Sequence, residues 1–245
     1  MSDSSSEIAA LCEMLDEYDV LDLSHTLEEG MPVFPSHAKY FQNQLLQMGD
    51  PAAMNQVTFS EHTGTHVDSP SHFVLDTDDP RCVPVDKVEI EKFVGRAVKL
   101  TFGPFTPTNA LVTRADIVEW EAANVDIVED DIVLCDFQWA SRWKRGRDGW
   151  AFMQGWPGLA ADAVDHLVGK GVKAVGTDCI SLDSGDGAGE TFPSHRGLLP
   201  RGILIFENVA NLARLPVVSV FVGLPLKMAG GTGSPVRAIA FVPRA

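Results

Sequence analysis

Hydrophobic and polar residues follow each other in short runs that predict many strands and few helices. Apolar runs typical of buried strands are EKFVGRAVKLTFG near 94–102, DIVLCDF (131–137), ILIFENV (203–209) and VSVFVGLPL (218–226). Helical spacing of apolar residues is found in IAALCEMLDEY, TRADIVEWEAANV and LAADAVDHLVGKG. This mixture predicts an α/β domain with a mixed, barrel-like β-sheet flanked by a few helices.

One further strand carries an unusual set of polar residues. We interpret NQVTFSEHTGTHVD as a single strand, in which every second side chain faces the same side. His62, His66 and Asp68 would then share one face, and Pro70 would end the strand before His72. Imidazole and carboxylate are ligands of zinc, manganese and iron(II). The pattern therefore indicates a metal site, with a hydrogen-bonded polar turn as the alternative.

The second half of such a site has to come from elsewhere in the chain. Glu207 closes the apolar run ILIF, and a buried carboxylate is costly without a partner or a metal. His195 lies just before that strand, so we expect it to join Glu207 in the site. His166 lies in a predicted helix and is interpreted as structural, whereas His25 and His37 show no spacing signal.

Composition excludes several classes of partner. The formal net charge of the 245 residues is −15 and no basic stripe is visible, so nucleic acid is not expected as a partner. No stretch of about 18 apolar residues predicts a membrane span. The four cysteines lie far apart without a C-x-x-C pair, and the N-terminus does not resemble a signal peptide. We therefore expect a cytoplasmic protein, with Cys135 and Cys179 in its core.

The longest predicted loop, 138–158, contains four of the five tryptophans, at positions 139, 143, 150 and 156. Loops of this length often carry function. Two interpretations are open: the tryptophans pack the loop onto the body of the protein, or at least one of them faces a substrate.

The segment HTGTHVDSPSH resembles the H-x-G-T-H-x-D-x-P-x-H signature of the cyclase family of metal-dependent hydrolases, which includes bacterial kynurenine formamidases and isatin hydrolases. LDLSHTLEEGMPVFP, GTDCISLD, HRGLLPRGILIFENVANL and GLPLKMAGGTGSPVRAIA resemble other blocks of that family in the same order. The resemblance implies a cyclase-like swivelling β/β/α fold. It also implies an N-terminal tail and helix over 1–19 and a single catalytic domain over 20–245.

The resemblance assigns a role to each matching residue. It implies a divalent metal ion, zinc or manganese, with one or two ions per chain. The metal ligands that it implies are His62, His66, Asp68, His195 and Glu207. Asp68 could bridge two ions, and His72 would move protons during catalysis. Two further aspartates of the matching blocks, Asp178 and Asp183, are expected to brace the site.

Arg196, directly after His195, complicates the metal count. An arginine is always charged and cannot bind a cation. If the side chain of Arg196 points inward, we expect one metal ion or a weakened second one. If it points away, it leaves the site unchanged.

These residues predict hydrolysis of an amide C–N bond. A bound divalent ion would polarise the carbonyl and activate water, and His72 would protonate the leaving nitrogen. No serine nucleophile is indicated, because G-x-S-x-G is absent. An aryl formamide such as N-formylkynurenine is the first substrate expected.

The alternatives are a cyclic amide such as isatin, a cyclase or dehydratase reaction on a polyketide-like substrate, and a metal-binding protein without activity. The family resemblance also implies a homodimer or a larger homo-oligomer.

Overall fold

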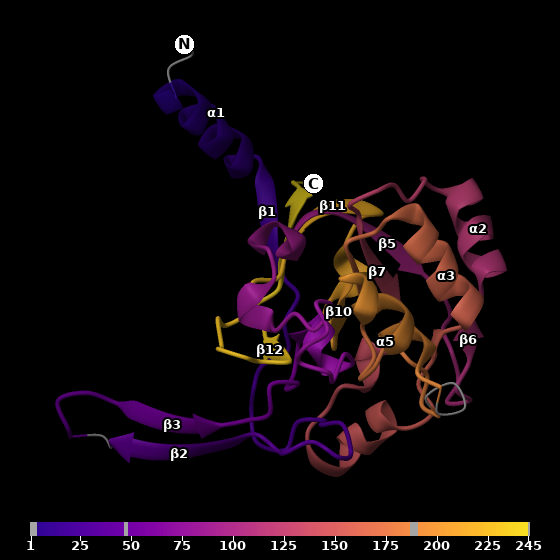
Figure 1. Ribbon diagram of the computed structural model, residues 1–245. Helices are drawn as coiled ribbons and strands as arrows, with labels where there is room; N and C mark the ends of the chain where they lie inside the picture. Colours follow the sequence, from indigo (N-terminus) through magenta and orange to yellow (C-terminus); the bar gives the residue numbers. More distant parts are fainter. Residues whose placement is uncertain (1–3, 47–48, 187–190, 245) are drawn as a thin grey trace.

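A computed structural model describes residues 4–46, 49–186 and 191–244 (Figure 1). A nine-stranded sheet has the order β1-β13-β11-β5-β7-β9-β10-β4-β12. Its strands, in chain order, are β1 (Tyr18–Asp22), β4 (His66–Asp68), β5 (Val94–Thr101), β7 (Ile132–Asp136), β9 (Ala174–Thr177), β10 (Leu204–Glu207), β11 (Val218–Val222), β12 (Gly233–Pro235) and β13 (Ile239–Pro243). Two-stranded pairs are formed by β2 (Phe41–Leu46) with β3 (Met54–Thr58), and by β6 (Leu111–Val112) with β8 (Gly158–Leu159).

The middle of the large sheet is parallel and its flanks are antiparallel. Strands β5, β7, β9 and β10 pair in parallel, while β11, β13 and β1 extend one side and β4 and β12 the other. Alternate residues of the parallel strands enter two separate hydrophobic clusters. Val133 and Cys135 lie in one cluster, and Ile132 and Leu134 lie in the other. Both faces of the parallel strands are therefore buried, as their continuous apolar runs predict.

The helices form where the sequence places their start and stop signals. Thr113 caps α2 (Arg114–Ala123) in a capping box with Asp116, and Gly171 ends α3 (Ala161–Lys170) in the left-handed conformation. These helices and α5 (Pro193–Leu198) cover the same side of the sheet (Figure 1). The mixed, curled sheet with few helices confirms the predicted fold class. Helix α5 was not expected from the sequence.

The expected continuous strand through 55–68 is wrong. Strand β3 ends at Thr58, and β4 begins only at His66. Between them Gly64 has a φ of 62°, a left-handed conformation that turns the chain and breaks the alternation of side chains. His62 therefore lies in a turn, and only His66 and Asp68 share a strand face.

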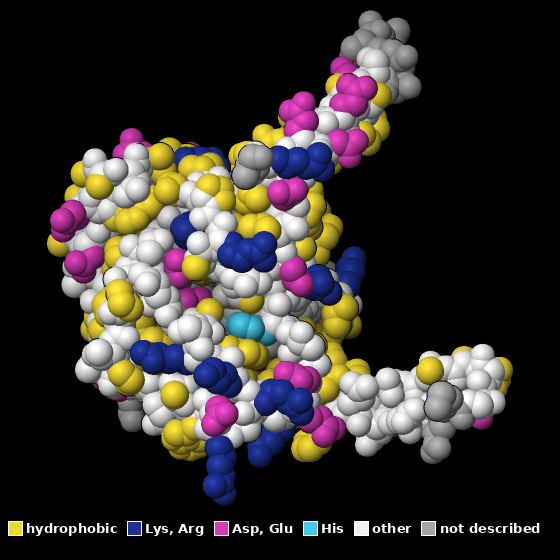
Figure 2. All heavy atoms as spheres, turned by 180° about the vertical axis from the view of Figure 1, so that it is seen from behind, with side chains coloured by type: hydrophobic (Ala, Val, Ile, Leu, Met, Phe, Trp, Pro, Cys, Tyr) yellow, Lys and Arg dark blue, Asp and Glu magenta, His cyan; other side chains and the backbone are white. Residues whose placement is uncertain are grey.

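Two segments extend away from the body of the protein on the same side (Figures 1 and 2). One is α1 (Ser4–Asp16), which is the helix expected near the N-terminus. The other is the hairpin β2–β3. We call them the two arms. Every residue of β3 is exposed, as are all residues of β2 except Leu46. The arms also carry large exposed apolar side chains: Ile8, Leu11, Met14 and Leu15 on α1, and Phe41, Leu45, Met54 and Val57 on the hairpin.

Among the described residues, no helix combines the length and the apolar character needed to cross a membrane.

Candidate metal centre

The short strand β4 places the centre of the site. It pairs antiparallel with β10, so that His66 lies directly opposite Glu207, and Asp68 opposite Ile205. Residues directly opposite each other in such a pair have adjacent side chains. Val67 points to the other face and is fully buried in a hydrophobic cluster. The sheet register therefore brings His66, Asp68 and Glu207 together although Glu207 is distant in sequence.

Hydrogen bonds orient two of the histidines toward these carboxylates. His66 Nδ1 lies 2.8 Å from the carbonyl oxygen of Gly64, which can only accept, so Nδ1 carries the proton. His195 Nδ1 lies 2.6 Å from Asp183 Oδ2 and is oriented in the same way. An imidazole held at Nδ1 by an acceptor presents Nε2 as the metal ligand.

Both Nε2 atoms converge on the same two carboxylates. His66 Nε2 lies 3.4 Å from Asp68 Oδ1 and 3.5 Å from Glu207 Oε2. His195 Nε2 lies 3.3 Å from Asp68 Oδ2 and 3.5 Å from Glu207 Oε1. All four side chains are buried, and Asp68 Oδ2 has no hydrogen-bond partner. Lone pairs and negative charges that meet in a buried space require a cation. The residues present therefore fit a divalent metal ion.

Protons are the other way to neutralise this cluster. Burial lowers the pKa of His66 and His195, but their carboxylate neighbours outweigh it and raise both pKa values above the ordinary range. Burial raises the pKa of Asp68, and the surrounding imidazoles outweigh this and hold it well below its usual range. Burial and the charge of Asp68 raise the pKa of Glu207. A metal ion must therefore displace protons from the imidazoles as it binds.

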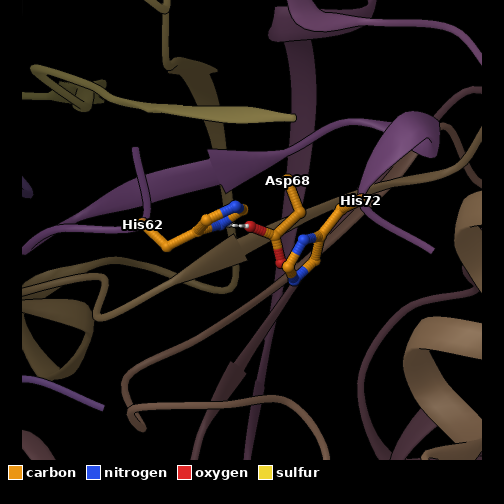
Figure 3. Close-up of side chains that lie close together, drawn as sticks. All are labelled: His62, Asp68 and His72. Carbon is orange, nitrogen blue, oxygen red and sulfur yellow. Dashed lines mark hydrogen bonds and ion pairs between the residues drawn. The ribbon is translucent and has the colours of Figure 1, made fainter. Parts of the chain in front are cut away.

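The rings of His62 and His72 both lie beside the carboxylate of Asp68 (Figure 3). His62 Nδ1 lies 2.6 Å from Asp68 Oδ1, and the His62 and His72 ring centroids are 4.0 Å apart. Ligand atoms of His62, Asp68 and His72 lie within 4.8 Å of one another, as do those of His66, Asp68 and Glu207. Asp68 thus belongs to both groups. Burial lowers the pKa of His72 to about 4, so this half-buried ring is neutral at neutral pH.

Of the two aspartates expected to brace the site, only Asp183 contacts one of its candidate ligands. Asp183 accepts hydrogen bonds from the backbone N–H groups of Ser194 and His195 and contacts the His195 ring. Asp178 accepts three backbone N–H bonds at the start of the 138–158 loop, from residues 137, 139 and 140. The contacts of Asp183 agree with the expected bracing role, whereas Asp178 fixes the start of the 138–158 segment. His166 pairs with Glu121 at 2.9 Å on the helical layer, which agrees with its structural interpretation.

The possibility that Arg196 points into the site is wrong. Arg196 is exposed, whereas its neighbour His195 is buried. Both residues lie on α5, where adjacent side chains diverge by about 100° around the helix axis. The guanidinium therefore gives no reason to expect a reduced number of metal ions.

The tryptophans of the 138–158 segment are used mainly for packing. Trp139 is fully buried and donates to the carbonyl oxygen of Phe152. Trp156 is buried and donates to the carbonyl oxygen of Asp183 at 2.7 Å, so it also fixes the residue that orients His195. Trp143 stacks on His25 at 3.9 Å, and only Trp150 is largely exposed, at 64%.

Sequence reasoning missed two neighbours of the centre. Thr232 Oγ1 lies 3.0 Å from His62 Nε2, and the His37 ring lies 5.6 Å from the His62 ring. Neither residue belongs to a periodic pattern, so only the HTGTHVDSPSH segment itself indicated where to look.

A cavity of about 720 Å³ lies apart from the centre, at the carboxyl ends of the parallel strands. Its lining includes Asp136, Trp143 and Asp178, and none of the candidate metal ligands.

Comparisons with known proteins identify the family of this chain. The family model Cyclase, described as "Putative cyclase", matches residues 21–184. The chain belongs to this family. A curated isatin hydrolase of Roseibium aggregatum is 30% identical over 79% of this chain and 76% of its own length. A kynurenine formamidase of Paracidovorax citrulli is 28% identical over 91% of this chain and 96% of its own length.

Solved structures extend this family likeness to the whole fold. An isatin hydrolase bound to the product analogue thioisatinate has a TM-score of 0.89 and 26% identity over 100% of both chains. Isatin hydrolase A from Labrenzia aggregata, bound to benzyl benzoate, has a TM-score of 0.85 and 29% identity over 98% of this chain and 99% of the other. The family, the fold class and the expected class of enzyme, an amidohydrolase of non-peptide C–N bonds, are thereby confirmed.

Proposed function

We propose that this protein is a metal-dependent hydrolase that cleaves the amide C–N bond of an aryl formamide such as N-formylkynurenine. The observation that carries the proposal is the convergence of His66, Asp68, His195 and Glu207 around one buried space. Relatives named kynurenine formamidase cover nine-tenths of this chain. Their named substrate class is therefore the first to test.

A cyclic amide such as isatin is the second candidate. An isatin hydrolase is the most identical of the relatives described above, and both of the solved structures described above are isatin hydrolases. Opening a lactam and removing a formyl group both require water to attack a carbonyl carbon and the carbon–nitrogen bond to break. The same residues serve both reactions.

The metal ion would be held by His66, Asp68, His195 and Glu207, with His62 beside Asp68. When bound, a divalent ion supplies a Lewis acid for the substrate carbonyl and lowers the pKa of water. Asp183 keeps the Nε2 atom of His195 directed inward, and the Gly64 carbonyl does the same for His66. Burial excludes bulk water from these carboxylates and strengthens their electrostatic effect.

His72 is the residue proposed to move the proton. Its ring lies beside His62 and 5.8 Å from the His195 ring, so it borders the centre on its more open side. Its lowered pKa leaves it neutral and able to accept a proton from the attacking water. It then returns that proton to the leaving nitrogen, which cannot depart as an anion.

We further propose that the ion is zinc or manganese and that one or two ions bind per chain. Mixed imidazole and carboxylate ligands suit both metals. The contact of His62 with Asp68 supports a second ion, because it adds one more imidazole beside a carboxylate that could serve two cations. Elemental analysis after metal saturation decides the identity and the count.

The two arms favour a second copy of the chain as the protein partner. A 13-residue helix and an isolated two-stranded hairpin are each marginal in water, and both arms expose apolar side chains. A second copy related by twofold symmetry can cover the arms of the first while its own are covered, which gives a closed homodimer.

The four cysteines are all free, which supports the expected cytoplasmic location.

A hydrolase assay of purified, metal-loaded protein tests the proposed function. Wild-type protein should hydrolyse N-formylkynurenine faster than isatin, with both reactions followed spectrophotometrically. The reverse order would favour the cyclic amide. Tight metal binding without turnover of either compound would contradict the hydrolase proposal.

A further inference from the structure

Phe192 has a backbone conformation that is unusual for its size. Its φ and ψ are 48° and 57°, in the left-handed region. Bulky residues are strongly disfavoured there, and glycine or asparagine is the usual occupant. Helix α5, which carries His195, starts at the next residue, and Phe192 provides no side-chain cap for it. The backbone alone would therefore favour glycine, so an advantage of the phenyl ring has to offset the strain.

The position of the ring indicates what that advantage is. The Phe192 ring lies 6.0 Å from the Phe73 ring, and the Phe73 ring lies 4.6 Å from the His195 ring, tilted by 31°. Phe73 is also 5.1 Å from the His72 ring. Both phenylalanines are half-buried, so each has an accessible part. They form an aromatic wall that begins beside the metal centre and extends outward from it.

We propose that the planar aryl group of the substrate packs against this wall and that Phe192 is a specificity-determining residue. The inference rests on the proposed amide hydrolysis. In an anilide the aryl ring is bonded directly to the leaving nitrogen. An aryl ring seated on Phe73 therefore keeps that nitrogen near His72, which has to protonate it. Aromatic rings 4.5–7 Å apart attract each other beyond simple burial of area.

The strain at Phe192 agrees with this role. Strained backbone positions persist where the surrounding structure holds them, and they cluster at functional sites. Replacement of Phe192 by glycine separates the two contributions, because it relieves the backbone and removes the ring. Gln138, which also has a positive φ of 58°, offers the matched control, since Gln138→Gly relieves the same kind of strain away from the wall.

The first test compares formanilide with N-cyclohexylformamide, which has a ring of similar size that is not planar. For Phe192→Gly, kcat/KM on formanilide relative to wild type should fall roughly 3- to 10-fold more than on the cyclohexyl compound. The melting temperature should stay the same or rise. Gln138→Gly should leave the ratio of the two substrates at its wild-type value. An equal fall on both substrates with a lower melting temperature would show that Phe192 is only structural.

A second test does not depend on catalysis. Isothermal titration of metal-loaded protein compares benzoate with cyclohexanecarboxylate, which carry the same charge. Wild type should bind benzoate more tightly, and Phe192→Gly should lose this preference. Equal affinities in wild type would overturn the inference. If neither formamide is hydrolysed, the proposed function fails, and this titration alone decides whether the wall selects aryl groups.

Discussion

The metal centre and the two arms contrast in the kind of group they leave unsatisfied. At the centre, buried polar groups converge, and Asp68 Oδ2 has no hydrogen-bond partner. On the arms, apolar side chains such as Leu11 and Phe41 are exposed on elements that extend from the body. A buried charge requires a cation, whereas an exposed apolar face requires another surface. Each region therefore indicates a different missing partner, an ion in one case and a protein in the other.

The largest effect is expected from Asp68→Asn, which removes the carboxylate that belongs to both ligand groups. We expect loss of bound metal and a fall in kcat/KM of roughly 10⁴-fold or more, because a metal ion supplies several kcal/mol of transition-state stabilisation. Elemental analysis and the formamide assay measure both quantities. His166→Ala and Arg196→Ala, which change residues outside the centre, should keep the wild-type metal content. Full activity of Asp68→Asn would contradict the assignment.

His72→Asn tests whether His72 transfers a proton or binds the metal. The variant should keep its metal and its fold, and turnover of amides should drop roughly 10²- to 10⁴-fold, the usual loss when a general acid–base group is removed. Ester substrates should lose less, because their leaving group needs less protonation. Should the variant lose metal instead, His72 is a ligand. Near-normal amide turnover with metal retained would assign the proton to another group.

Asp183→Asn tests the support behind His195 without removing a ligand. The carboxylate accepts from the His195 ring and from two backbone N–H groups. Loss of such support usually costs 10- to 100-fold in metal affinity or activity, and we expect a change of that size here. Metal titration and kcat/KM on N-formylkynurenine measure it. If neither quantity changes, His195 is oriented by other contacts.

Metal affinity should rise with pH. The raised pKa values of His66 and His195 keep these imidazoles protonated to a higher pH than the ordinary value of about 6.5. Protons therefore compete with the metal below those pKa values and cease to compete above them. We expect the apparent affinity to improve about tenfold per pH unit for each imidazole that titrates. Competition with a chelator between pH 6 and 8 measures the slope, and a flat profile would exclude displacement of protons.

The sequence predicted the regions in which burial is continuous. The apolar runs of β7 and β10, in which every residue is buried, and the signals at Thr113 and Gly171 gave elements close to those observed. Strand β2 and its pairing with β3 were missed because both faces of the hairpin are exposed, which leaves no alternation to detect, and β3 was predicted only as part of the strand 55–68. Helix α5 was missed because it is short and follows a phenylalanine in a left-handed conformation.

At the centre, the structure brings the predicted residues together, but part of the reason for grouping them was wrong. Even spacing predicted that His62 would share a strand face with His66 and Asp68. The left-handed turn at Gly64 breaks that strand, and His62 reaches Asp68 from the turn. Glu207 was selected because it closes a buried strand, and the register opposite His66 explains its place. Contacts such as that of His37 depend on how a loop packs, which no local pattern encodes.

The smallest effect on chemistry is expected from the arms, and this prediction separates them from the centre. Leu11→Gln removes an exposed apolar side chain of α1, which is 44% accessible in the single chain. Glu13→Gln on the same helix is the matched control, because it introduces the same residue at a polar exposed position. If a second copy covers α1, Leu11→Gln should weaken the dimer roughly tenfold or more, since an apolar side chain of this size contributes about 1.5–3 kcal/mol when fully buried. Glu13→Gln should leave the dimer intact, and both variants should retain the wild-type metal content.

Analytical ultracentrifugation over a range of micromolar concentrations measures the association. A wild-type monomer at these concentrations would exclude the dimer, and a dimer unaffected by Leu11→Gln would assign its interface to a surface other than α1.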